Sequence, residues 1–395
     1  MFRTPVGRGA SASERIETTA PSIGPRGLDT GAERPPRPAD GAGAKRPTRP
    51  ATGRGRTAAW AVALGAALAA SVVAAVTIGP AGLAPSDVVA SILAHLGIGE
   101  PTLSPLRDGI VWELRMPRVL TAAAVGAGLA LCGAVMQALT RNPLADPYLL
   151  GLSSGASVGA VIVIVLGVGL LLPFAAFAGA LVALVATLAL AGAAGRGSAR
   201  GSGGGLSPTR TVLAGLAVSS MFGAVTSLVI FWSATGDSYR EILNWLLGSL
   251  AGTDWVSVAI AGGALVAIGI PLIASARTLD AFAFGDAAAS ALGVHVGRSR
   301  LLLLGGTALL TGALVAVSGS IGFVGLILPH GVRLLVGSRH RALLPLSALA
   351  GALFLVWADT AARTLFDPRE LPVGIITALV GGPVFALLLM RRRVS

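Results

Sequence analysis

The sequence is poor in charge, in lysine and in cysteine, and these shortages exclude several classes of protein. Only 12% of its 395 residues are charged, about half the share of an ordinary soluble domain, whereas 54% are hydrophobic. This composition excludes a water-soluble globular enzyme and indicates a polytopic membrane protein. The single cysteine, Cys132, excludes an intrachain disulfide and a cysteine-based metal cluster.

Lysine is almost absent, which limits how the protein could obtain energy. The one lysine, Lys45, lies between Ala44 and Arg46. A P-loop, Gly-x-x-x-x-Gly-Lys-Ser/Thr, needs its lysine to neutralise the nucleotide phosphates, so this chain has none. Ion-coupled transporters usually keep charged residues within their spans, whereas here only Asp359 comes near one. The sequence therefore favours a pore energised by a separate subunit, with an ion-coupled transporter or a membrane scaffold or receptor as alternatives.

The net charge of +12 is concentrated in a tail and in short clusters. Residues 1–56 hold eleven Lys and Arg against five Asp and Glu, are rich in Pro, Gly, Ser and Thr, and show no apolar periodicity. We interpret 1–56 as a disordered basic cytoplasmic tail and 57–395 as the transmembrane domain. The remaining bases lie between apolar stretches, which is the positive-inside pattern of a membrane protein and does not indicate a nucleic-acid partner.

Uncharged stretches predict where the chain crosses the membrane. The 49 residues between Asp146 and Arg196 would reach about 73 Å as one helix, against a bilayer core of about 30 Å, so they hold two spans with a turn near Pro173. The apolar piece 242–253 is too short to cross and is expected to lie in the interface. Single spans are expected in 58–78, 119–140, 211–236, 255–276, 342–358 and 371–390.

The stretch 301–332 is long for one helix and short for two, and its flanking charges decide between these. Arg298 and Arg300 precede it and Arg333 follows it, so both of its ends are expected on the basic, cytoplasmic side. The segment 319–322 can make the tight turn of a hairpin. The prediction is an all-α protein with ten spans and both termini cytoplasmic, which places 24 of the 30 Lys and Arg inside.

No group of residues predicts catalysis or a bound metal. The four histidines are scattered and match no ligand spacing. His330 follows Pro329 near the end of a span, where a structural or pathway role is expected. We expect no catalytic site, no metal site and no cofactor bound by this chain.

Two loops are too patterned to be simple linkers. In 140–156, an Asn-Pro and an Asp-Pro pair break the helix and Ser-Ser-Gly restarts one. In 279–293, two short cytoplasmic helices are expected, broken at Gly285, with Asp286 in the first turn of the second. Their apolar faces need a partner, and a re-entrant or lipid-facing helix is the alternative.

A series of short motifs runs along the chain in a defined order. They are Leu114-Arg115-Met116-Pro117-Arg118, Asn142-Pro143-Leu144-Ala145-Asp146-Pro147 with Gly151 and Ser154-Gly155-Ala156, then 285–293, Gly322-Phe323-Val324-Gly325-Leu326 with Pro329-His330 and Arg333, Glu370-Leu371-Pro372-Val373-Gly374 and Gly381-Gly382-Pro383-Val384-Phe385. Together they resemble the FecCD-type permeases of ABC importers for iron-siderophores, haem and vitamin B12. The resemblance covers about residues 58–393, and the chain departs from the family at Met116, where Leu is usual, and in its long tail.

This resemblance implies the type II ABC importer permease fold, with ten transmembrane helices in each subunit of a permease homodimer or heterodimer. A cytoplasmic ABC ATPase dimer, which uses ATP and Mg, and an extracytoplasmic substrate-binding protein would complete the importer in a bacterial cell membrane. The implied function is translocation of a ferric siderophore or similar iron chelate, with haem and cobalamin as alternatives. The chain itself would not be an enzyme.

The motif matches also imply roles for individual residues. The outward arginines that pair with acidic groups on the binding protein would be Arg115, Arg118 and Arg363, although snorkelling is an alternative role for the first two. The coupling helices that sit in a cleft of the ATPase would lie in 279–293, with contacts through Leu279, Gly285, Asp286, Ala287, Leu292 and Gly293. Gate and pathway residues would be Ser207, Thr209, Asn142, Pro143, Pro329 and His330, and Pro208 departs from the small polar residue that is usual at its position.

Overall fold

The chain forms helices and no strand throughout the residues that the computed structural model describes, which are 53–100, 103–196, 207–233, 235–366 and 369–391. This agrees with the all-α prediction. Of the basic tail predicted for 1–56, residues 1–52 lie outside the described residues. Residues 53–56 belong to the first helix, so this helix begins earlier than the charge pattern suggested.

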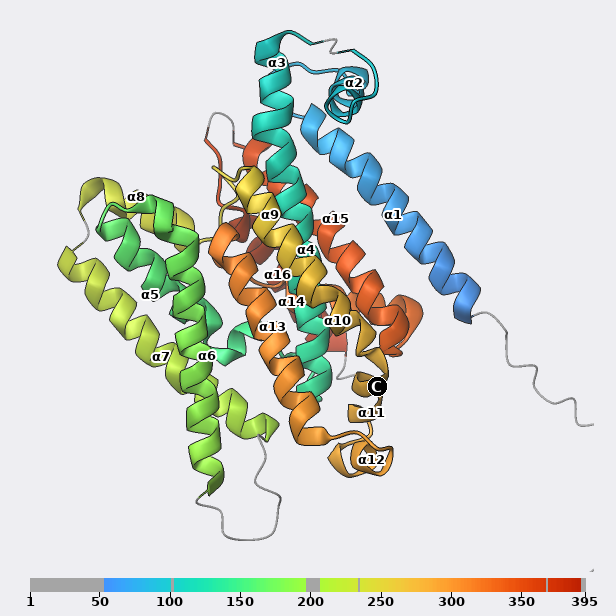
Figure 1. Cartoon of the computed structure of the whole chain (residues 1–395), viewed down its shortest axis with the longest axis vertical. Helices are drawn as coiled ribbons and strands as arrows, with labels where there is room; N and C mark the ends of the chain where they lie inside the picture. Colours follow the sequence, from blue (N-terminus) through green and yellow to red (C-terminus); the bar gives the residue numbers. More distant parts are fainter. Residues whose placement is uncertain (1–52, 101–102, 197–206, 234, 367–368, 392–395) are drawn as a thin grey trace, which may run out of the picture. The chain divides into compact units, whose positions relative to one another are not determined.

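The helices follow one another as labelled in Figure 1. Short pieces of helix alternate with long ones, and two of the long ones contain a π-helical stretch. The bounds are α1 (Gly53–Thr77), α2 (Pro85–His95), α3 (Pro105–Gly109), η1 (Ile110–Arg115), α4 (Met116–Thr140), η2 (Pro147–Leu150), α5 (Leu152–Val165), η3 (Gly169–Leu171), α6 (Leu172–Arg196), α7 (Pro208–Ser233), α8 (Gly236–Leu246), α9 (Trp255–Ala264), η4 (Leu265–Gly269), α10 (Ile270–Ala274), α11 (Ala276–Phe282), α12 (Asp286–Ala291), α13 (Val296–Ser318), α14 (Val324–Val336), α15 (His340–Thr364) and α16 (Val373–Arg391).

Ten helical segments account for the ten predicted spans. Among the described residues, seven are long and apolar enough to cross a membrane: α1, the continuous helix from α3 to α4, α6, α7, the helix from α9 to α10, α13 and α15. Three shorter apolar helices, α5, α14 and α16, complete the set. The predicted turn near Pro173 is confirmed, because α5 ends at Val165 and α6 begins at Leu172.

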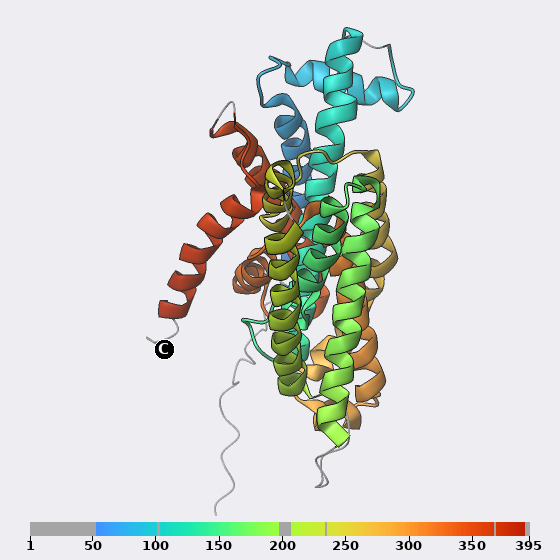
Figure 2. The same ribbon diagram turned by 90° about the vertical axis from the view of Figure 1, so that its left-hand side faces the viewer.

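Helix α4 is the centre of the domain, and α15, α14, α13 and α9 pack around it (Figures 1 and 2). Its most apolar window is 89% buried, against 17% for α1. A Cβ atom added at Gly126 would collide with the carbonyl oxygen of Gly351 in α15, and one added at Gly133 would collide with that of Gly325 in α14. Glycine at these crossings therefore allows the helix backbones to touch.

The predicted hairpin in 301–332 is confirmed. Helix α13 ends at Ser318, and the turn begins with Gly319 at φ +66°, a conformation that favours glycine. The loop after α4 supports this turn from the side, because the hydroxyl of Tyr148 donates to the carbonyl oxygen of Ile321 at 3.0 Å. The patterned loop 140–156 and the hairpin turn at 319–322 thus meet in space.

The segment 242–253, which is expected to lie in the interface, is helical only in its first part, and its place in the membrane stays a prediction. The helix there, α8, begins earlier, at Gly236, and ends at Leu246, with Ile242 and Trp245 buried. The residues that follow are not helical, because they pair with other backbone groups. Ser249 N donates to the carbonyl oxygen of Ser318 at 2.9 Å, so this piece is fixed to the end of α13.

Candidate functional site

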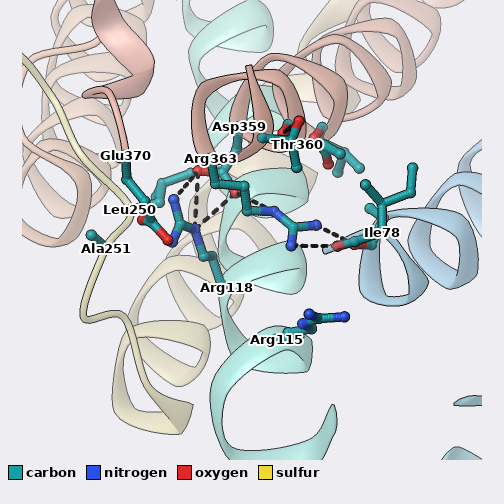
Figure 3. Close-up of polar contacts among 12 residues, drawn as sticks. Ile78, Arg115, Arg118, Leu250, Ala251, Asp359, Thr360, Arg363 and Glu370 are labelled. Carbon is teal, nitrogen blue, oxygen red and sulfur yellow. Dashed lines mark hydrogen bonds and ion pairs between the residues drawn. The ribbon is translucent and has the colours of Figure 1, made fainter. Parts of the chain in front are cut away.

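The three predicted docking arginines come from two helix ends that meet beside the end of α1 (Figure 3). Arg115 ends the π-helical stretch η1, and Arg118 lies in the first turn of α4, three positions later. This spacing places both side chains on neighbouring positions of one helix face. Arg363 lies in the last turn of α15, four positions after Asp359, whose carboxylate points toward Arg118.

Arg118 joins three segments of the chain. Its Nε donates to both carboxylate oxygens of Asp359, at 3.1 and 2.9 Å, and its Nη2 donates to one of them at 3.0 Å. Its Nη1 donates to Oε2 of Glu370 at 2.7 Å. The side chain of Asp359 is 1% exposed and that of Glu370 is 49% exposed. Arg118 therefore connects α4 to the buried face of α15 and to the exposed segment before α16.

The other two arginines cap the C-terminal end of α1. Arg115 Nη1 donates to the carbonyl oxygens of Val76 and Thr77 at 2.7 and 3.2 Å. Arg363 Nη1 donates to that of Ile78, the residue after α1, at 2.9 Å, and its Nη2 donates to the carbonyl oxygen of Ala75 in α1. The last carbonyl groups of a helix lack partners within it, and cations are favourable there because of the helix dipole. These two side chains thus hold α1 against α4 and α15.

The structure therefore brings the three arginines together but gives each a partner within the chain. They line a cavity of about 490 Å³ with Glu370 and with small and apolar residues from the ends of α1, η1 and the loop before α9. Their partners were missed by sequence reasoning. The only local signal was the four-residue spacing of Asp359 and Arg363 on a helix, because Arg118 precedes Asp359 by 241 positions. Docking to another protein stays a prediction.

Two short helices, α11 and α12, are separated at Gly285 as predicted, although α11 begins at Ala276, before segment 279–293. Gly285 separates them with φ +96°, a conformation that favours glycine. Leu279 is fully buried, so it anchors α11 to the domain and is not on its surface. The residues of this segment that were predicted to contact an ATPase and are exposed are Ala287, Leu292 and Gly293.

Two charged contacts tie these short helices to long ones. Asp280 in α11 accepts a hydrogen bond from the backbone N–H of His340 at 3.0 Å and lies 2.7 Å from its Nδ1, at the start of α15. Asp286 in α12 accepts one from Arg300 Nη2 of α13 at 2.7 Å. This hydrogen bond holds the pKa of Asp286 below its ordinary value. A movement of α11 would thus be transmitted to α15, and a movement of α12 to α13.

A second cavity, of about 500 Å³, lies beside α11 at the ends of α4 and α14. Arg141, Arg333 and Arg339 line it together with His340 and Asp280, which gives it a cationic lining. Arg333 Nη2 donates to Oε1 of Gln137 in α4 at 3.1 Å, a contact that sequence reasoning did not find. The domain thus offers a basic surface next to the short helices.

The predicted gate and pathway residues fall in three separate segments. Pro143 lines the cavity beside α11, and the hydroxyl of Ser207 accepts a hydrogen bond from Arg210 N at 3.3 Å at the start of α7. The six residues are Asn142 and Pro143 after α4, Ser207 and Thr209 at the start of α7, and Pro329 and His330 within α14. Their role in a pathway stays a prediction. Within the described part of the chain, no group of three or more His, Cys, Asp or Glu side chains could hold a metal ion.

Ten spanning helices, with a pair of short helices at one end and an arginine cluster at the other, define a membrane permease subunit. The model of the FecCD transport family matches residues 67–391, and the chain belongs to this family. It is thus a multi-pass membrane protein of the ABC importer permease type.

Known relatives agree with this assignment. The chain is 43% identical to an uncharacterized ABC transporter permease protein, YvrB, of Bacillus subtilis, over 82% of this chain and 91% of the relative. It is 41% identical to the cobalamin import system permease protein BtuC of Halobacterium salinarum, over 86% and 98%. It is also 41% identical to the hemin transport system permease protein HmuU of Yersinia pestis, over 72% and 84%. A solved inward-facing structure described as a metal-chelate type ABC transporter has a TM-score of 0.71 and 32% identity, over 84% of this chain and 98% of that one.

Proposed function

We propose that this chain is the translocating subunit of an importer for a ferric siderophore or a similar iron chelate, energised by ATP hydrolysis in a partner ATPase. The observation that carries the proposal is the pair α11 and α12, which is tied to two spanning helices in a chain that has no P-loop of its own. A transporter of this design needs a subunit that delivers energy to these helices. The basic cavity beside α11 lies at the same end of the domain, and it supports the proposal that the ATPase binds at this end.

Haem and cobalamin are the second candidates. The hemin and cobalamin permeases among the relatives favour them, because each covers more than two thirds of this chain.

We propose further that a substrate-binding protein docks at the outer arginine cluster. The permease works as a homodimer or heterodimer in a bacterial cell membrane, with both termini cytoplasmic.

Uptake by the reconstituted importer tests the substrate. The permease, with the ATPase and the binding protein encoded beside it, is placed in liposomes and offered a labelled ferric siderophore, haem or cobalamin. We expect ATP-dependent accumulation of the siderophore. Accumulation of haem or cobalamin alone would reassign the substrate, and uptake driven by an ion gradient without ATP would reject the importer class.

Charge reversal at Asp286 tests the coupling role of α12. Asp286→Arg sets two cations together at Arg300, so we expect the permease to assemble but ATP hydrolysis to continue with little uptake. Asp237→Arg is the matched control, because it makes the same charge change in the first turn of α8, another short helix. Normal uptake by Asp286→Arg would remove α12 from the coupling mechanism.

A further inference from the structure

Glu370 forms an ion pair with Arg118, one of the arginines on which docking would depend. Its Oε2 accepts a hydrogen bond from Arg118 Nη1 at 2.7 Å, while its side chain is 49% exposed. Asp359, the other carboxylate on Arg118, is 1% exposed and is held by three contacts. Asp359 is therefore a fixed partner, whereas the exposed Glu370 contact is weak enough to exchange.

The surroundings of Glu370 favour a carboxylate from outside the chain. Glu370 lines the outer cavity of about 490 Å³ together with Arg115, Arg118 and Arg363. Three guanidinium groups there face only two carboxylates, so a cationic surface remains, and it becomes more cationic when Glu370 leaves Arg118. Arginine can hold an incoming carboxylate with two parallel hydrogen bonds.

We propose that Glu370 is an internal competitor, which holds Arg118 until a carboxylate on a docking protein replaces it. The inference rests on the proposed function, because the docking protein is the substrate-binding protein of the importer. The partner surface that fits this cavity is an acidic one, with an Asp or Glu side chain that reaches Arg118.

The exchange also changes how the start of α16 is held. Glu370 lies three positions before Val373, where α16 begins, and the next residue, Leu371, donates its N–H to the carbonyl oxygen of Ala362 at 3.0 Å. The side chain of Glu370 ties this segment to α4 through Arg118. When another carboxylate takes Arg118, that tie is released, while Asp359 keeps Arg118 on α15.

Glu370→Gln tests the competitor. The full permease, assembled with its ATPase in lipid nanodiscs, is titrated with the labelled binding protein encoded beside it, at low ionic strength. We expect binding about three- to fivefold tighter, or about 0.7–1 kcal/mol, which is the range for an exposed ion pair. The gain should shrink at high salt. Glu113→Gln is the matched control, because it removes an exposed carboxylate of η1 that does not contact Arg118, and its affinity should stay within about twofold of wild type.

The sign of the effect separates the competitor from other roles. Weaker binding by Glu370→Gln would mean that Glu370 orients Arg118 or touches the partner itself, and unchanged binding would mean that it does not compete; either result overturns the proposal. The salt dependence of wild-type binding tests docking separately, because charge reversal at Arg118 would also break its buried pair with Asp359. Binding that weakens with salt but is unchanged in Glu370→Gln rejects the competitor alone, whereas binding that is unaffected by salt and unchanged in Glu370→Gln rejects the docking site as well.

Discussion

At the scale of single residues, Asp359 determines the geometry of the outer cluster. It lies in the last third of a spanning helix, is 1% exposed, and has Arg118 and Arg363 on its two sides. A buried carboxylate is costly unless it is paired, so its two cations are what allow it there. Sequence reasoning found Asp359 only as a charge near a span, because its main partner lies on another helix.

Asp359→Ala should therefore destabilise the protein strongly. The substitution leaves two guanidinium groups without their shared anion, and breaking a buried ion pair by removal of one partner costs about 3–5 kcal/mol. Thermal unfolding of the detergent-purified permease should show a clear fall in melting temperature. Glu370→Ala, which removes the exposed partner of the same arginine, should cost less than about 1 kcal/mol. Equal melting temperatures of Asp359→Ala and wild type would show that this carboxylate does not stabilise the arginine cluster.

At the scale of helices, the crossing of α4 and α15 depends on small residues. Gly126 and Gly351 face each other with no room for a Cβ atom on either. Lipid is as apolar as the helix surfaces, so close van der Waals packing, rather than a hydrophobic driving force, holds such helices together. This crossing also sets the distance between Arg118 and Asp359, one on each helix.

Gly126→Ala is expected to push α4 and α15 apart. The added methyl group meets backbone, which cannot rotate away, and overpacking of this kind costs about 1–3 kcal/mol. The melting temperature should fall by several degrees. Gly65→Ala in α1 is the control, because a Cβ atom there meets nothing within 4 Å and alanine favours a helix. Similar melting of the two variants would contradict close packing at the crossing.

The sequence could predict most of these helices but not how they pack. Charged residues on either side of each apolar stretch located the spans, and the bases around 301–332 identified the hairpin. The start of α8 at Gly236 was missed because the segment that precedes Ile242 is polar and gives no apolar signal. The polar contacts Asp280–His340 and Arg118–Asp359 join segments 60 and 241 positions apart, and no local pattern encodes such a pairing.

At the scale of the whole transmembrane domain, α15 connects its two ends. Near its C-terminal end Asp359 holds Arg118, and at its first residue His340 contacts Asp280 of α11. Its 25 residues correspond to about 37 Å, the full thickness of a bilayer core and more. One continuous helix thus joins the arginine cluster to the short helices that we propose contact the ATPase.

The positive-inside rule predicts the orientation of the domain in the membrane. The α2–α3 end and the α11–α12 end lie at opposite ends of Figure 1. Arg141, Arg333 and Arg339 line the cavity beside α11. Ser104, at the start of α3, and Ser290, in α12, are both exposed. In a background of Cys132→Ala, which removes the one native thiol, Ser104→Cys should react with an impermeant thiol reagent on intact cells, and Ser290→Cys only after the cells are opened. As a control, both thiols should react with the reagent in permeabilised cells. Labelling of Ser290→Cys but not Ser104→Cys on intact cells would invert the orientation and would place α11 and α12 on the side away from any cytoplasmic ATPase.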